Sequence, residues 1–246
     1  PLCCQCSIIS NIWRRNSGLL RMLFFLSCKT IGYYICGQDV VGRTDTKILS
    51  SEEYLQSKRF ELKNIVQTFI SILRGINVSG QKKILMTELK ALYESLKFSD
   101  VNTYIQSGNV SFKTKEKLSD IQIAVKIEKA IYKKYAFEVP VIIRNEDELK
   151  KIISSNPFLK GKGIDIKKLH VTFLSQIPGD AEIKNISEVD YSPDRFAIHG
   201  KEIYLHIPES YGETKLSNNF FEKKLKVKAT TRNWKTVNKL LEMVSQ

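Results

Sequence analysis

Apolar positions alternate with polar ones or recur at helical spacing along the chain from Thr68 onward. The β-prone run 68–76 has no breaker before Gly75, so it predicts a strand, which the loop 77–83 follows. Apolar residues then recur at intervals of three and four over 86–98, which predicts a helix with Thr87 as its N-cap. The apolar stripe of this helix consists of Met86, Leu89, Leu92, Tyr93 and Leu96.

A hairpin, a second helix and a fourth strand complete this first set of elements. Segments 101–106 and 109–114 are β-prone and flank Ser107-Gly108, a pair typical of a tight turn. A strand is expected at 139–145, and the helix before it is marked by Ile121, Val125, Ile127, Ala130, Ile131 and Tyr135. The predicted order is therefore β-α-β-β-α-β.

The same order of elements follows a second time, after a helix at 146–155 and a turn at Asn156-Pro157. The patterns predict a strand at 169–177, a short helix at 179–186 and a hairpin about Gly200-Lys201 at 195–207. They also predict a helix at 217–227 and a short extended segment at 228–234. A final helix would place Val237, Leu240, Leu241 and Val244 on one side. We therefore expect an α+β protein of two tandem ferredoxin-like (βαββαβ) sandwiches, 66–146 and 147–246, with a C-terminal helix.

Residues 1–65 differ in kind from the rest of the chain. All five cysteines lie within the first 36 residues, in a spacing that matches neither a zinc site nor an even disulfide framework. The apolar stretch 19–36 is interrupted by Arg21 and Lys29, so it is too short to span a bilayer. We expect 1–65 to be a nonnative or disordered extension, and the alternative is a membrane-directed leader.

Six segments in the remaining chain carry a family resemblance: LRGINVSG at 73–80, TYIQSGNV at 103–110, VPVIIR at 139–144, NPF at 156–158, KLHVTFL at 168–174 and ATTRNWKTV at 229–237. Together they resemble the bacterial family called domain of unknown function 1697, over about 66–246. The resemblance implies tandem ferredoxin-like domains, a soluble cytoplasmic protein and no firmly assigned activity. Two glycine-rich loops of the family are only partly matched here, at Gly80, Lys83, Gly212 and Lys215.

The first candidate site follows from the expected topology. In a βαββαβ sandwich the end of the first strand and the turn between the second and third strands lie at one edge of the sheet. This edge would gather Arg74, Asn77, Gly80, Lys83, Gln106, Ser107 and Asn109, which suit a phosphate or a carboxylate. The alternative is that these residues serve turn geometry alone, with Arg74 tying the loops together.

A second candidate site is expected at the opposite edge of the second sandwich, where the loop 208–215 would approach the end of the fourth strand. It would gather Tyr211, Thr214, Lys215, Thr231, Arg232, Asn233 and Trp234, which suit a nucleotide-like ligand. In the alternative, Trp234 anchors the last helix to the core, Thr231 or Asn233 caps that helix, and Arg232 pairs with an acid at the domain junction.

The formal net charge of +13 favours an anionic partner, and from residue 67 onward 30 Lys and Arg stand against 21 Asp and Glu. Nucleic acid is a less favoured partner, because the expected third strands lack the aromatic-rich pattern with which an RNA-binding sheet stacks bases. The lysines fall instead on helix surfaces, where a solvated face explains them.

Several chemistries are not supported by the sequence. It has no phosphate-binding loop of the G-x-x-x-x-G-K-[ST] type, no G-x-G-x-x-G, no H-E-x-x-H and no G-x-S-x-G. The three histidines have no partner at ligand spacing, so we expect no metal site and no cofactor. The leading hypothesis is a module that binds a small anionic ligand, phosphate- or nucleotide-like. A weak nucleic-acid binder and an enzyme of unrecognised chemistry remain as alternatives, and no membrane partner is expected for 66–246.

Overall fold

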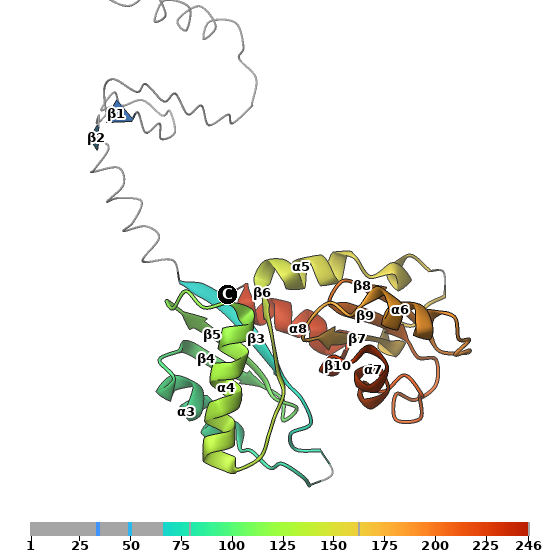
Figure 1. Ribbon diagram of the computed structural model, residues 1–246, viewed down its shortest axis with the longest axis horizontal. Coiled ribbons are helices and arrows are strands. Elements are labelled where there is room, and N and C mark those ends of the chain that lie inside the picture. Colours follow the sequence, from blue (N-terminus) through green and yellow to red (C-terminus); the bar gives the residue numbers. More distant parts are fainter. Residues whose placement is uncertain (1–32, 35–48, 51–65, 79, 162, 246) are drawn as a thin grey trace, which may run out of the picture. The chain divides into compact units, whose positions relative to one another are not determined.

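The computed structural model describes residues 33–34, 49–50, 66–78, 80–161 and 163–245 (Figure 1). The chain divides into two units, 1–62 and 63–246. The expectations for 1–65 lie outside the described residues, apart from two short strands, β1 (Tyr33–Tyr34) and β2 (Leu49–Ser50), which pair antiparallel.

The first half of the second unit contains a four-stranded antiparallel sheet of order β4-β5-β3-β6. Its elements are, in chain order, β3 (Gln67–Leu73), α3 (Met86–Ser95), β4 (Ser99–Tyr104), β5 (Asn109–Thr114), α4 (Asp120–Tyr135) and β6 (Val141–Asn145). The central pairs join Ile70 to Ser111 on one side of β3 and to Arg144 on the other. Strand β6 is an edge strand.

The second half repeats this order of elements. After α5 (Glu146–Ser154) and two short 3₁₀ helices, η1 (Pro157–Lys160) and η2 (Ile166–Lys168), come β7 (Leu169–Leu174), α6 (Asp180–Ser187), β8 (Arg195–His199), β9 (Glu202–His206), α7 (Asn218–Leu225), β10 (Ala229–Asn233) and α8 (Trp234–Val244). The sheet order β10-β7-β9-β8 equals that of the first sheet read from its other end. The structure is therefore mixed α+β with two four-stranded antiparallel sheets.

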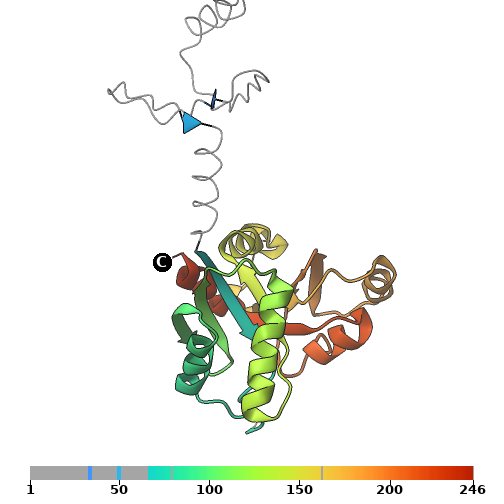
Figure 2. The same ribbon diagram turned by 60° about the vertical axis from the view of Figure 1, so that its left-hand side comes forward.

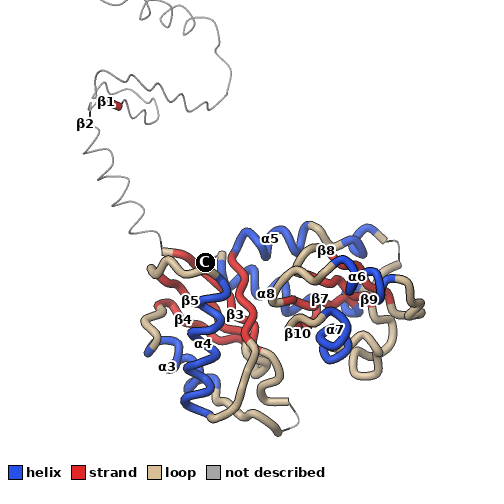
Figure 3. Tube along the Cα trace, viewed as in Figure 1, coloured by secondary structure: helices blue, strands red, loops and turns tan. Residues whose placement is uncertain are grey.

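Each sheet buries both of its faces. In β3, Phe69 and Leu73 pack with α3 and α4, whereas the alternate residues Ile70 and Ile72 belong to a second apolar cluster. This second cluster, shared by both halves, also contains Val171 and Phe173 of β7 and residues of α5 and α8. Figures 2 and 3 show α8, the last helix, beside strands of both sheets, and it contacts β3, β5, β7 and β10. The two halves therefore share one hydrophobic core, and α8 and α5 cover sheet faces that an open nucleic-acid platform would need.

The expected order of elements is confirmed, but some of the expected strand ends and helix caps are not. The strands expected to reach residues 76 and 177 end at Leu73 and Leu174. After Leu73 the chain turns through Gly75, whose φ of 70° is incompatible with an extended strand. Thr87 is not an N-cap, since Leu85 occupies that position without a side-chain hydrogen bond.

Helix α4 buries a narrower face than its apolar residues indicate. Ile123, Ile127 and Ile131 are fully buried, whereas Ile121 is 68% exposed and Val125 is 40% exposed. Among the described residues no helix is long and apolar enough to cross a bilayer, and no group of His, Cys, Asp and Glu side chains could hold a metal ion.

Candidate functional site at the junction of the two halves

Arg232 of β10 lies between the two halves and is only 9% exposed. Its Nε donates to Asn109 Oδ1 at 2.8 Å, and its Nη2 donates to the carbonyl oxygens of Leu73 at 2.7 Å and Ser107 at 2.8 Å. Its Nη1 donates to two acceptors of its own strand, Thr230 Oγ1 and Thr231 O, both at 2.9 Å. All five N–H groups of this guanidinium therefore donate to acceptors of the protein.

Arg144 of β6 makes the reciprocal set of contacts and is 2% exposed. Its Nη2 donates to Leu174 O at 2.7 Å and to Lys201 O at 3.2 Å, and its Nε donates to Glu202 Oε1 at 2.9 Å. Leu174 ends β7 as Leu73 ends β3, and Glu202 begins β9 as Asn109 begins β5. The fourth strand of each half thus places an arginine at the equivalent position of the other half. Such an exchange of equivalent contacts is the mark of a twofold arrangement.

Arg144 is not among the site residues predicted from the sequence, although the sequence contains a signal for it. An Arg-Asn pair stands at 144–145 and again at 232–233, directly before a helix in both places. Asn145 Oδ1 accepts from Glu148 N at 2.9 Å, and Asn233 Oδ1 accepts from Thr236 N at 2.8 Å, so both asparagines are N-caps. Aligning the two halves on this dipeptide would have found the arginine.

Within the part of the chain that the structure describes, Arg232 has no acidic partner. The expectation that it pairs with an acid at the domain junction is wrong, because carbonyl groups and Asn109 take up its N–H groups. Burial lowers the pKa of Arg232 to about 10, and the neighbouring Tyr211 acts in the opposite direction. The guanidinium is still cationic at neutral pH, so the junction holds a buried positive charge.

The loop after β3 and the turn between β4 and β5 meet as expected. Leu73 N donates to Gly108 O at 2.8 Å, and Asn77 Nδ2 donates to Gln106 O at 2.9 Å. Asn77 Oδ1 also accepts from Ile84 N at 2.9 Å, and Asn109 Nδ2 donates to Ser107 Oγ at 3.1 Å. Asn77, Gln106, Ser107 and Asn109 therefore hold these loops together.

Arg74 points from the first half into the second. Its Nε donates to Glu222 Oε1 at 2.8 Å, and its Nη2 donates to Glu222 Oε2 and to Asn219 Oδ1, both at 2.6 Å. Glu222 Oε1 also accepts from Ala229 N at 3.0 Å. The two candidate sites were expected at separate edges, but Arg74 and Arg232 join both sets of residues at one junction. We call Arg74, Tyr211, Asn219, Glu222, Thr231 and Arg232 the junction cluster.

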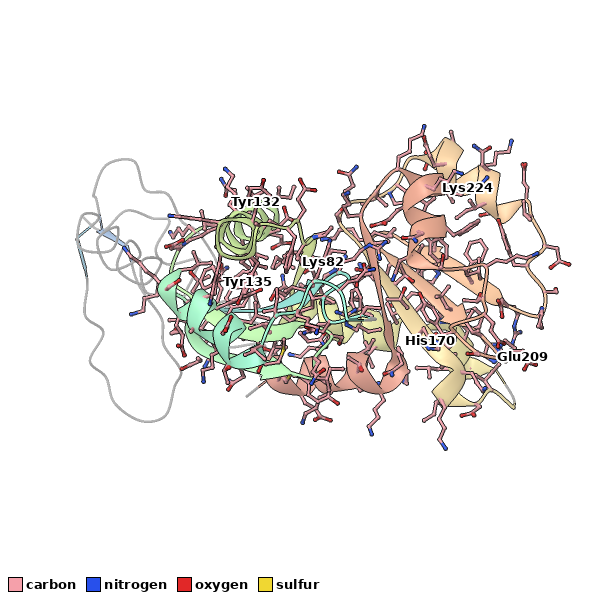
Figure 4. All side chains as sticks on the ribbon, turned by 90° about the horizontal axis from the view of Figure 1, so that it is seen from below. Lys82, Tyr132, Tyr135, His170, Glu209 and Lys224 are labelled. Carbon is pink, nitrogen blue, oxygen red and sulfur yellow. The ribbon has the colours of Figure 1, made fainter. Side chains whose placement is uncertain are left out.

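Tyr211 brings a hydroxyl group into this cluster. Its ring stacks on His170, with the ring centroids 4.8 Å apart (His170 is labelled in Figure 4). Its Oη is buried and has no hydrogen-bond partner among the described residues. Burial raises the pKa of Tyr211, while Thr231 and the charges of Arg74 and Arg232 act in the opposite direction. The hydroxyl is therefore protonated at neutral pH and lies within reach of two guanidinium charges.

Thr231 Oγ1 already has two partners in the cluster. It donates to Asn218 Oδ1 at 2.7 Å and accepts from Thr172 Oγ1, also at 2.7 Å. Its contact with Tyr211 Oη falls short of hydrogen-bond geometry. The Tyr211 hydroxyl thus keeps its full donor capacity.

The remaining candidate residues lie outside the cluster. Trp234 is 7% exposed and packs in the shared core, which leaves no ring face for a ligand. Thr214 Oγ1 donates to Asp194, and Asn233 caps α8. Lys83, Lys215 and Gly80 are exposed, and within the described ranges neither lysine forms an ion pair or a side-chain hydrogen bond.

Comparison with known proteins assigns the chain to a family. Residues 66–204 match the profile of a family described as a protein of unknown function, DUF1697. The chain belongs to this family. The match confirms the resemblance of the sequence motifs, and it covers more than half of the chain.

One solved structure extends this result to the fold. Conserved bacterial protein SP0830 from Streptococcus pneumoniae is similar with a TM-score of 0.59 and 23% sequence identity, over 73% of this chain and 99% of that chain. At this identity the likeness concerns the fold alone. No curated protein matches the chain.

Proposed function

We propose that this protein is a binding module for a small anionic, phosphate-bearing ligand and that the junction cluster is its site. The observation that carries the proposal is the Tyr211 hydroxyl, buried without a partner beside Arg74 and Arg232. A buried donor without an acceptor costs about 1 to 3 kcal/mol. An anion that accepts from Tyr211 Oη would recover this cost.

The charges of the cluster support the same ligand. Arg74 pairs with Glu222, whereas the acceptors of Arg232 are all uncharged, so the cluster carries one excess positive charge. The Nη1 of Arg74 has no hydrogen bond to any described residue, whereas its Nε and Nη2 hold Glu222 and Asn219. Arg74 Nη1 and Tyr211 Oη are thus the two donors we assign to the anion, and Arg232 contributes its charge rather than an N–H group.

We infer that the two halves, 66–146 and 147–246, are tandem ferredoxin-like domains, because both have the element order β-α-β-β-α-β and the same strand order. In this arrangement the junction cluster is an interdomain site, a common place for small-ligand pockets. We also propose that the protein acts in the cytoplasm.

Titration calorimetry of the full chain with inorganic phosphate and with adenosine monophosphate tests the function. We expect saturable binding that weakens by about tenfold in Tyr211→Phe, since one charge-assisted hydrogen bond is lost. The substitution removes a hydroxyl that has no partner and retains the ring stacked on His170, so the variant folds. Tyr132→Phe is the matched control, because Tyr132 is an exposed residue of α4 (Figure 4).

Two results would reject the proposed site. Equal affinities of wild type and Tyr211→Phe would exclude Tyr211 as a ligand group. Binding of polynucleotides with a steep dependence on salt, unaffected by Tyr211→Phe, would favour non-specific nucleic-acid binding through surface lysines instead.

A further inference from the structure

A groove lies between α4, the edge strand β6 and the segment that follows β7. Its volume is about 530 Å³, within the range of small-molecule sites. Its apolar wall includes Ile121, Val125 and Ile177, all of which are exposed. Glu128 and Ser175 also line it. We call this space the α4–β6 groove.

The groove occupies the place in the first half that the Arg74–Glu222 pair occupies in the second. Glu128 Oε1 accepts from Val141 N, the first residue of β6, at 2.8 Å, as Glu222 Oε1 accepts from Ala229 N, the first residue of β10, at 3.0 Å. Glu128 and Glu222 therefore occupy equivalent positions in the two halves, as Arg144 and Arg232 do.

Ser175 is the equivalent of Arg74. Arg74 directly follows β3, and its backbone N–H donates to Pro140 O at 2.9 Å. Ser175 directly follows β7, and its backbone N–H donates to Lys228 O, also at 2.9 Å. Pro140 and Lys228 each precede the first residue of a fourth strand. In the second half, the guanidinium of Arg74 binds the carboxylate of Glu222. The equivalent residue facing Glu128 in the first half is Ser175, whose side chain is too short to reach the Glu128 carboxylate.

Glu128 consequently lacks the cation that Glu222 has. Among the described residues its carboxylate has one hydrogen-bond partner, Val141 N, and no ion pair. Burial raises its pKa, with a smaller contribution in the same direction from Glu138, while the bond from Val141 and the charge of Lys228 oppose the increase. A half-buried carboxylate without a counter-ion is stabilised when a cation reaches it.

The other charges of the groove do not neutralise Glu128. Arg144 pairs with Glu202 at 2.9 Å, and Lys201 pairs with Glu148 at 2.7 Å and lies 3.9 Å from Asp120. With Glu138 and Lys228, whose charges also act on Glu128, five acids stand against three bases around the groove: Asp120, Glu128, Glu138, Glu148 and Glu202 against Arg144, Lys201 and Lys228. The net charge is negative, opposite in sign to that of the junction cluster.

We propose that the α4–β6 groove binds a small organic cation, an alkylguanidinium or alkylammonium compound, with its charged head on Glu128 and its alkyl stem along Ile121, Val125 and Ile177. The Arg74–Glu222 pair supplies the precedent within the same molecule, since it is a guanidinium bound to the equivalent carboxylate by two hydrogen bonds. The exposed apolar wall accounts for the stem.

A small molecule fits this site better than an extended peptide that adds a strand to β6. Val141 N already donates to Glu128 Oε1, and Ile143 O already accepts from Arg144 Nη1 at 2.7 Å. These backbone groups face away from β3, on the side where a further strand would pair. Because side chains already form hydrogen bonds with them, they are not free to pair with a peptide strand.

The test is titration calorimetry of the full chain with agmatine, and with n-butanol as the uncharged comparison. We expect saturable agmatine binding, no n-butanol binding, and a loss of about tenfold or more in agmatine affinity in Glu128→Gln. Glutamine retains an oxygen that can accept from Val141 N, so this variant keeps the structural bond. Glu188→Gln, which alters an exposed acid of the α6 C-terminus, is the matched control and should bind as wild type does.

Ser175→Arg gives a second, independent readout. By analogy with Arg74, the new guanidinium should bind Glu128, raise the melting temperature and abolish agmatine binding. The proposal is overturned if wild type does not bind agmatine, if Glu128→Gln binds it equally well, or if Ser175→Arg is no more stable than wild type and still binds agmatine. Saturable binding of an arginine-containing peptide without any binding of agmatine would also overturn it. None of these results bears on the phosphate site, which involves different residues of opposite charge.

Discussion

At the scale of single residues, the two buried arginines determine how the halves meet. Arg232 reaches Asn109, which is 123 positions away in the sequence, and Arg144 reaches Glu202, 58 positions away. A sequence pattern of period two or 3.6 carries no information about such partners. The residues around the first candidate site could be predicted because they are close in the chain and share one sheet edge. Their connection to Arg232 and Glu222 could not.

Replacing either arginine by alanine should destabilise the protein strongly. Arg232→Ala removes the donor to the carbonyl groups of Leu73 and Ser107, and Arg144→Ala removes the donor to the carbonyl group of Leu174. Arg144→Ala also removes one of the two donors to Lys201 O, which keeps its bond from Leu174 N. We expect each variant to lose about 3 to 5 kcal/mol in the free energy of unfolding, measured by urea denaturation. Lys223→Ala, on the exposed side of α7, should change it by less than about 0.5 kcal/mol. A loss below about 1 kcal/mol in both arginine variants would contradict the structural role.

Glu128 should make the stability of the protein depend on pH. Burial raises its pKa in the folded state, so the folded protein holds this proton to a higher pH than the unfolded chain does. Its contribution to stability is therefore lost as the pH rises through the interval between the ordinary and the raised pKa. Glu128→Gln should remove this loss and be more stable relative to wild type at pH 7 than at pH 4. Urea unfolding across that range provides the measurement, and an identical pH dependence of both proteins would contradict it.

At the scale of elements, the order of strands and helices could be predicted from periodicity, whereas caps and ends could not. Thr87 has the residue type of an N-cap but lies inside α3, because the chain enters the helix at Leu85. Ile121 and Val125 count as helical apolar positions in the sequence, yet tertiary packing leaves them on the wall of a groove. Local pattern fixes the type of an element, and its neighbours fix the buried face.

The equivalent caps of α5 and α8 allow a direct comparison. Asn145→Ala and Asn233→Ala should each cost about 1 kcal/mol, because each removes the acceptor for a backbone N–H of the first helical turn. Thr87→Ala is the matched control and should be close to neutral, since Thr87 makes no cap bond. Thermal or urea unfolding of the three variants measures the difference. A cost for Thr87→Ala equal to that of the asparagine variants would show that α3 begins elsewhere.

At the scale of the whole unit, the equivalent positions of the two halves explain why one half has an ion pair where the other has a groove. The same backbone frame holds Glu222 and Glu128, but Arg74 fills the first place and Ser175 leaves the second open. The repeat of elements could be predicted from the sequence, but this exchange of contacts could not, because the two halves share few residues. The two halves thus differ in the side chains placed on equivalent positions.

The most direct test of the junction site is a crystal of the full chain soaked in sodium tungstate, examined by anomalous diffraction. Tungstate has the charge and shape of a phosphate, and its metal scatters strongly. We expect a peak within hydrogen-bonding distance of Tyr211 Oη and Arg74 Nη1, and a weaker peak there in Tyr211→Phe soaked at the same tungstate concentration. Peaks confined to surface lysines, with none at the junction cluster, would contradict the proposed function.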